Sequence, residues 1–98
     1  MKVIELLDRP EKWTKGTWAR DKAGMGVPGD SPAATQWCIL GAVDRCYPTE
    51  NVRLWSEALH HLVVALLHLH NTRLIAEWQD RPETTWEQVR TLLERAGV

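Results

Sequence analysis

The first candidate for chemistry in this sequence is the thiol of Cys38. A nucleophilic cysteine needs a lowered pKa, which a helix N-terminus or a neighbouring cation can supply. Ser31 and Pro32 are a typical N-cap and first residue, and they predict a helix that runs from Pro32 to about Cys46. In that helix Cys38 lies about two turns inside, on an apolar surface that raises the thiol pKa. We therefore predict that Cys38 packs in the core and forms no disulfide with Cys46.

Four histidines could in principle bind a metal ion: His60, His61, His68 and His70. Two ligands on one helix must be three or four residues apart to reach the same ion. None of these histidines has that spacing from another. We therefore predict solvated or partner-facing histidines, no metal site and no cofactor.

Six tryptophans stand out in a chain of 98 residues that has no phenylalanine and one tyrosine: Trp13, Trp18, Trp37, Trp55, Trp78 and Trp86. Each indole can bury about 150–250 Å² and needs a partner for its N–H group. We expect Trp37, Trp55 and Trp86 to lie on the core faces of helices. We expect the other three to lie near loops, where tryptophan often serves in pockets and interfaces.

Three polar residues, Arg20, Asp21 and Asp80, are predicted in loops next to Trp18 and Trp78. If these loops converge, Arg20 could pair with Asp80 and close the loop segment onto the helices. Loop residues on a rigid scaffold often carry function, but caps and salt bridges that fix irregular backbone are the alternative. The candidate ligand-binding or partner-binding set is therefore Trp13, Trp18, Arg20, Asp21, Trp78 and Asp80, with no catalytic residue assigned.

The elements that must position these residues are mostly helical. We predict a mainly α fold, a single helical domain over residues 1–98, with four to five helices and a short irregular or β-hairpin arm near residues 13–28. The longest helix begins near 49–51 and ends at His70 and Asn71, with an apolar seam at steps of three and four. A shorter helix spans about 72–79. Thr84 and Glu87 match a capping box that starts the last helix.

The charge pattern excludes two kinds of partner. The chain carries 12 basic and 13 acidic residues, for a net charge of −1, and no long block of either sign. Nucleic-acid binders show a basic patch, and membrane-surface helices show a basic face. No apolar run reaches the roughly 20 residues of a membrane span, and the opening residues lack the apolar run of a signal peptide. We expect a cytoplasmic protein that binds neither nucleic acid nor membrane.

Three strings occur in a fixed order: Trp13–Gly16 followed by Ala19–Asp21, Trp37–Ala42, and Trp78–Pro82 followed by Thr84 or Thr85. Together they resemble a family of small bacterial and phage proteins known only as a domain of unknown function. That family carries a Trp-Cys-x-x-Gly-Ala helix and a late Trp-Asn-Asp-x-Pro segment. This chain departs from it at Gln79, where the family typically has asparagine, and in its short opening helix. The resemblance implies a fold and a phage-linked context rather than a reaction.

Two classes of function remain open at this point. The first is a small non-catalytic interaction protein, a phage or mobile-element accessory factor that binds a host protein, for instance an inhibitor of a host defence system of the anti-CRISPR type. The second is a binding protein or enzyme for a small, nucleotide-like ligand in a tryptophan-lined site. We favour the first, and with it a protein partner. The sequence leaves the oligomeric state open between monomer and homodimer.

Overall fold

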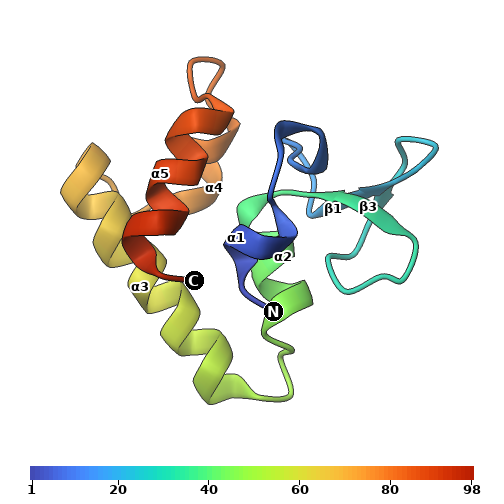
Figure 1. Cartoon of the computed structure of the whole chain (residues 1–98), viewed down its shortest axis with the longest axis horizontal. Helices are drawn as coiled ribbons and strands as arrows, with labels where there is room; N and C mark the ends of the chain where they lie inside the picture. The colour runs from blue at the N-terminus through green and yellow to red at the C-terminus, as the bar shows by residue number, and fades with distance from the viewer.

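A computed structural model describes residues 1–98 of the chain (Figure 1). Its helices are α1 (Val3–Leu6), α2 (Ile39–Cys46), α3 (Val52–His70), α4 (Ile75–Asp80) and α5 (Trp86–Ala96), with a 3-10 turn η1 (Pro10–Lys12). Its strands are β1 (Ala19–Asp21), β2 (Gly26–Val27) and β3 (Ala34–Trp37).

The fold is mixed α/β, so the prediction of a mainly α bundle is wrong. The three strands form one antiparallel sheet in the order β2-β1-β3, next to five α-helices that together with η1 make up 52% of the chain. The predicted arm does contain the β1–β2 hairpin. The sheet gains its third strand from residues 34–37, which were predicted to be helical.

The error arose at Ser31, which caps a turn and not a helix. Its side-chain oxygen accepts a hydrogen bond from the amide of Ala33, and its carbonyl accepts one from Ala34. Beyond this turn, residues 34–37 pair with β1, with Ala19 opposite Trp37. Thr35 and Trp37 are residue types that favour strands. The helix therefore begins later than predicted, at Ile39, with Cys38 as its N-cap.

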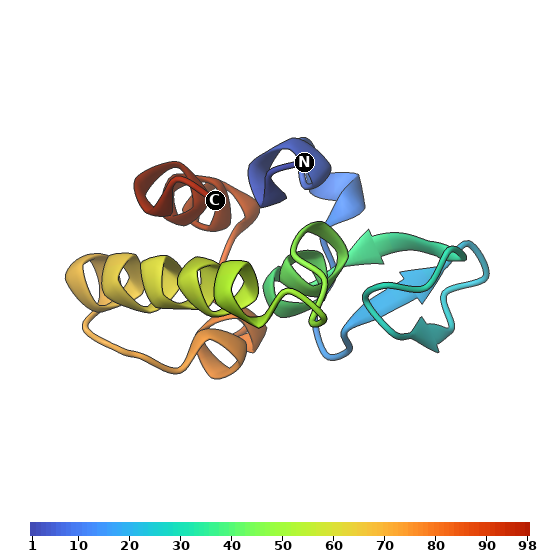
Figure 2. The same ribbon diagram turned by 90° about the horizontal axis from the view of Figure 1, so that it is seen from below.

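Helix α2 lies between the sheet and helices α3, α4 and α5, with α1 beside it (Figures 1 and 2). Figure 2 shows α3 and α5 stacked at one end of the molecule, α4 beneath α3, and the sheet at the opposite end. The hydrophobic core joins these parts, because Ile39 and Val43 of α2 belong to the same buried cluster as Leu62, Leu66 and Leu92. Ala19 of β1 and Trp37 of β3 also belong to it.

The other helices begin and end closer to the predicted residues than α2 does. α3 begins after Asn51, whose side chain accepts a hydrogen bond from the amide of Leu54, and its C-cap is Asn71 in the left-handed conformation (φ 54°). The capping box of α5 is real but one residue later than predicted, formed by Thr85 and Gln88. Thr84 is buried instead, and its hydroxyl donates to the carbonyl oxygen of Trp78 (2.6 Å).

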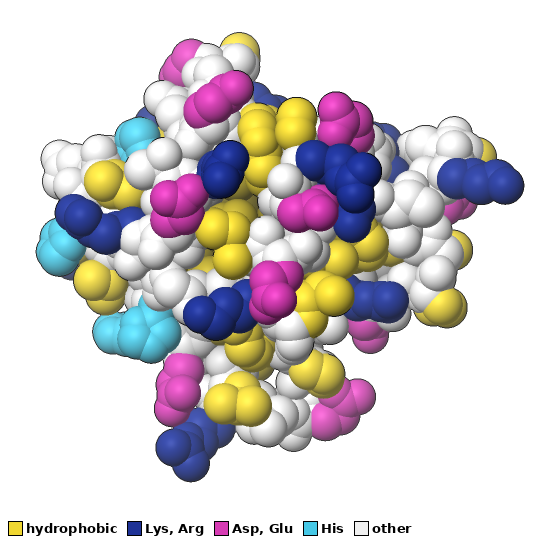
Figure 3. Space-filling model, viewed as in Figure 1, with side chains coloured by type: hydrophobic (Ala, Val, Ile, Leu, Met, Phe, Trp, Pro, Cys, Tyr) yellow, Lys and Arg dark blue, Asp and Glu magenta, His cyan; other side chains and the backbone are white.

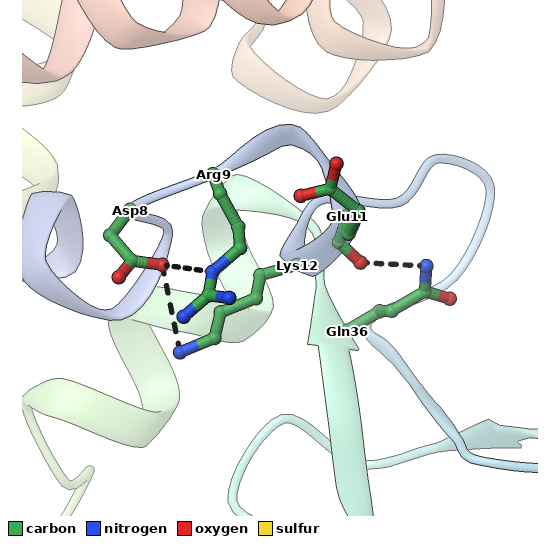
Figure 4. A network of polar contacts seen from close by, with 5 residues as sticks. All are labelled: Asp8, Arg9, Glu11, Lys12 and Gln36. Carbon is green, nitrogen blue, oxygen red and sulfur yellow. Dashed lines mark hydrogen bonds and ion pairs between the residues drawn. The ribbon is translucent and has the colours of Figure 1, made fainter.

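A polar network holds η1 against β3 (Figure 4). The side-chain amide of Gln36 donates to the carbonyl oxygen of Glu11 at 3.0 Å (Figure 4). Asp8 pairs with Arg9 and Lys12, and its hydrogen bond from Arg9 is the main reason why the pKa of this exposed carboxyl is lowered. The network brings the chain alongside β3, where the amide of Thr14 donates to the carbonyl of Trp37.

The surface seen in Figure 3 carries basic and acidic side chains interspersed over most of its area. Its histidines gather on one side, over α3. No helix combines the length and the apolar character that a bilayer crossing requires.

Candidate functional site

The predicted site residues do not form one cluster. Two of them, Trp18 and Asp80, line a shallow cleft of about 310 Å³ together with Cys38 and Gln79. We call this hollow the small cleft. Its walls come from the segment before β1, from the start of α2 and from the end of α4.

The backbone of Trp18 is held tightly against α2. Its carbonyl oxygen accepts a hydrogen bond from the amide of Cys38 (3.0 Å) and lies against the Cα of Gly41, where any Cβ would overlap it. Gly41 has no Cβ, and this allows the carbonyl to approach its backbone closely. The indole itself points outward and is 52% exposed. Trp18 thus presents a large apolar ring on a rigid backbone.

Gln79 organises the interior side of the small cleft, and sequence reasoning missed it. It is 2% exposed, and its side-chain oxygen accepts hydrogen bonds from the amide of Ile39 (2.8 Å) and from the indole N–H of Trp13 (3.1 Å). Its side-chain nitrogen donates to Asp80 (2.6 Å). One signal was available, because Gln79 lies four residues after Ile75 and so shares the apolar face of α4.

Lys15 forms a second link between the arm and the helices, which the sequence did not predict. Its ammonium group donates to the carbonyl oxygens of Arg81 and Thr84, just beyond α4. It also lies over the ring of Trp13, 5.3 Å from the centroid. The backbone amide of Gly16 donates to Asp80 (3.0 Å). These contacts fix the segment that leads into Trp18.

The side chains of Arg20 and Asp21 form hydrogen bonds within the arm. Arg20 donates to the hydroxyl of Thr14 and to the carbonyls of Lys15 and Gly24, at 2.9 to 3.2 Å. Asp21 accepts hydrogen bonds from backbone amides of the hairpin turn that follows it. No ion pair joins Arg20 to Asp80. The side chains of Arg20 and Asp21 thus hold irregular backbone in place. This is the alternative to a binding role that the sequence left open.

The three tryptophans expected near loops differ in exposure. Trp78 is 3% exposed and packs against His70, with ring centroids 4.7 Å apart. Trp13 is half-buried, bound to Gln79 through its N–H and tilted against Trp86 at 6.4 Å. Trp18 is the one whose ring is mostly open to solvent. Trp37, by contrast, is buried as expected, but at the end of a strand.

Cys38 lies at a helix N-terminus and not two turns inside a helix, which corrects the sequence prediction. Its sulfur accepts a hydrogen bond from the amide of Gly41 (3.2 Å). That contact favours the thiolate, but burial outweighs it and raises the pKa of the Cys38 thiol. Both cysteines are free. The thiol therefore stays protonated near neutral pH and acts as a cap.

A second hollow of about 800 Å³ is also lined by Trp18, and we call it the large cleft. It opens between the loop that follows β2 and the end of α2. Beside the indole it is lined by three carboxylates, those of Asp30, Asp44 and Glu50, and by the guanidinium of Arg45. None of these charged groups forms an ion pair within the chain.

A third hollow is an apolar groove of about 490 Å³ between α2, α3 and α4. Leu59 and Val63 of α3 form one wall, and Leu74 and Ile75 lie at the start of α4. Leu40 and Ala76 line both this groove and the small cleft, so the two hollows adjoin each other. Leu74 is 59% exposed. An apolar surface therefore extends from Trp18 past Leu40 to Leu74.

No group of three or more histidine, cysteine or acidic side chains is gathered closely enough to hold a metal ion. No curated protein and no solved structure matches the chain. A family model does match, described as a family of unknown function (DUF6197), over residues 1–97. With nearly every residue matched, the chain belongs to the DUF6197 family.

Proposed function

We propose that this chain is a non-catalytic interaction protein that binds a protein partner through the apolar surface formed by Trp18, Leu40, Leu74 and Ala76. The observation that carries the proposal is the exposure of Trp18 on a backbone that Cys38 and Gly41 hold in place. Tryptophan is among the residues most enriched at binding hot spots. A ring that is already fixed in position loses little conformational entropy when a partner covers it.

The adjoining groove supports a protein as the partner. Leu74 and Trp18 are both mostly exposed, and Leu40 and Ala76 connect them across the two hollows. Clusters of exposed apolar side chains on a folded domain mark interaction sites more often than isolated ones do. The groove edge carries Arg73 and Glu77, which gives the apolar surface a polar rim.

We propose further that the partner is a host protein and that the chain serves as an accessory factor of a phage or mobile element. Inhibition of a host defence system is the form of this role that we favour. The support comes from the sequence, since its three ordered strings resemble those of phage and bacterial proteins.

A nucleotide-like ligand is a weaker alternative. That hypothesis needed the indoles of Trp13, Trp18 and Trp78 to wall one site, but Trp78 is buried and only Trp18 of the three lines either cleft. The large cleft beside Trp18 carries three carboxylates, which repel phosphate groups.

The test compares Trp18→Ala with Met25→Ala in affinity capture from a bacterial host lysate, followed by calorimetric titration of the purified captured protein. Met25 is the matched control, because it is a large apolar side chain, 67% exposed, at the hairpin away from the groove. We expect Trp18→Ala to weaken binding by about thirtyfold or more, as for a hot spot of about 2 kcal/mol. Met25→Ala should bind like the parent chain. Equal binding by both variants, or no protein captured above background, would contradict the proposal.

A further inference from the structure

The large cleft beside Trp18 offers a recognition chemistry that the apolar groove does not. We infer that it receives an arginine side chain of the protein partner, with the guanidinium stacked on the Trp18 indole and paired with the carboxylates of Asp30 and Glu50. This inference rests on the proposed function, because the partner supplies the arginine. The volume of the large cleft, about 800 Å³, lies within the range of roughly 300–1,000 Å³ that is typical of binding cavities.

The carboxylates of the cleft are free to pair with an incoming cation. Elsewhere on the surface Asp8, Glu57, Glu77 and Glu94 each have an arginine partner within the chain. Asp30 and Glu50 are exposed, and no arginine or lysine of the chain pairs with either. Asp44 accepts the indole N–H of Trp55 through one oxygen (2.8 Å), and its other oxygen makes no hydrogen bond within the protein.

The cation already present in the cleft does not neutralise these groups. Arg45 is exposed, and its guanidinium is directed to the carbonyl oxygen of Ser31, at 3.5 Å. One guanidinium thus faces three carboxylates, and the cleft keeps an excess of negative charge. Such an excess in a concave site attracts cations and repels anions.

The indole decides between arginine and lysine. A guanidinium is planar, so it can stack on the face of Trp18 while its edge donates to carboxylates. The ammonium of lysine is more strongly hydrated and cannot form this fork of hydrogen bonds. The exposed ring and the adjacent carboxylates therefore match arginine better.

The experiment uses the full chain and acetyl-arginine-amide as the probe. Each of the six tryptophans has one indole N–H group, and the nuclear magnetic resonance signal that disappears in Trp18→Phe is the one from Trp18. Acetyl-citrulline-amide, which has the same shape without the charge, is the matched ligand control. We expect the Trp18 signal to shift in a saturable way with the arginine probe and to stay in place with the citrulline probe. Equal shifts with both probes, no shift with either, or tighter binding of acetyl-lysine-amide would overturn the inference.

A double variant tests the carboxylates. Asp30→Asn with Glu50→Gln should weaken binding of the arginine probe by about fivefold to tenfold, as expected for two partly exposed ion pairs. Glu83→Gln with Glu87→Gln removes the same charge from exposed positions outside the cleft, and should leave the affinity unchanged. Equal losses in both double variants would show that only net charge matters, and would overturn the inference.

The same variants separate this inference from the proposed function. Suppose that Trp18→Ala abolishes binding of the captured partner while the double variant at Asp30 and Glu50 binds it fully. The inference then fails and the proposed function stands. If neither change affects the partner, the proposed function itself fails.

Discussion

The backbone carbonyl of Trp18 lies directly against the Cα of Gly41, with no room for a Cβ between them. The same carbonyl accepts the amide hydrogen bond of Cys38, so the two segments cannot separate without losing that bond. Gly29 also lies against the backbone of Gly41, and the carbonyl of Gly29 accepts the indole N–H of Trp37 (2.9 Å). Two glycines thus let three segments of backbone stack at the start of α2.

We therefore expect Gly41→Ala to lower the free energy of unfolding by about 2–4 kcal/mol, because the new methyl group would meet backbone that cannot move aside. Helix propensity alone predicts the opposite sign, a gain of about 1 kcal/mol. Urea denaturation measures the difference. Ser56→Ala, at an exposed position of α3, should change stability by less than about 0.5 kcal/mol. If Gly41→Ala left the stability unchanged or raised it, the backbone contact would not be what requires glycine at this position.

The side-chain oxygen of Gln79 leads to a second prediction. Gln79→Leu keeps a similar volume but removes the acceptor for two donors, the amide of Ile39 and the indole N–H of Trp13. A buried donor without a partner costs about 1–3 kcal/mol, so we expect a loss of about 2–5 kcal/mol. Gln36→Leu is the control, since its hydrogen bond to Glu11 lies at the surface and should cost less than about 1 kcal/mol. Equal stability changes in thermal unfolding would contradict the role of Gln79.

Helix α3 and the β1–β2 hairpin could be predicted from the sequence, and strand β3 and the start of α2 could not, for local reasons. The seam of α3 and its two asparagine caps are encoded within a few turns of chain, so its bounds were close. Strand β3 depends on pairing with residues of β1 that lie 13 to 18 positions earlier, and its sequence gives no alternation to reveal it. Ser31 and Pro32 form a turn, although their residue types predict the start of a helix. The local sequence pattern therefore indicates where the loop ends, but it does not identify the strand that follows.

The candidate site was only partly predictable for a similar reason. Trp18 and Asp80 do line one cleft, but the residues that connect them to the scaffold, Lys15 and Gln79, act across more than 60 positions of sequence. Spacing along one helix cannot reveal such partners. Arg20 showed the same limit, because two of its three side-chain hydrogen bonds go to backbone carbonyls, which every residue carries.

Cys38 provides a third prediction, because its sulfur serves as the N-cap of α2. Serine is a better cap than most residues, so Cys38→Ser should keep the free energy of unfolding within about 1 kcal/mol of the parent, while Cys38→Ala should lose about 0.5–2 kcal/mol. Partner binding should survive in Cys38→Ser. A loss of function in Cys38→Ser with unchanged stability would instead indicate a chemical role for the thiol. Urea denaturation and calorimetric titration provide the two measurements.

The pH dependence of stability provides a fourth prediction. Burial raises the pKa of the Cys46 thiol from 9.0 to about 11. Between these two values the unfolded chain releases this proton and the folded chain keeps it, so the free energy of unfolding falls as pH rises from 9.0 to about 11. Below pH 9.0 the effect of this thiol is absent. Cys46→Ala should make the fall shallower in urea denaturation across this range, and an equally steep fall would show that other groups, such as Tyr47, account for it.

The contrast between Trp18 and Trp78 gives the last prediction. Trp78 is 3% exposed and Trp18 is 52% exposed, so removing each ring tests a different role of the same residue type. Trp78→Ala should destabilise the fold by about 3–5 kcal/mol through the cavity that it leaves beside His70. Trp18→Ala should cost less than about 1.5 kcal/mol of stability, because much of its ring is already in water, while binding of the partner weakens by about thirtyfold or more. Urea denaturation measures the stability of both variants, and calorimetric titration measures their binding of the partner. If Trp18→Ala unfolded the chain as readily as Trp78→Ala, the exposed indole would be part of the core, and its assignment to binding would fail.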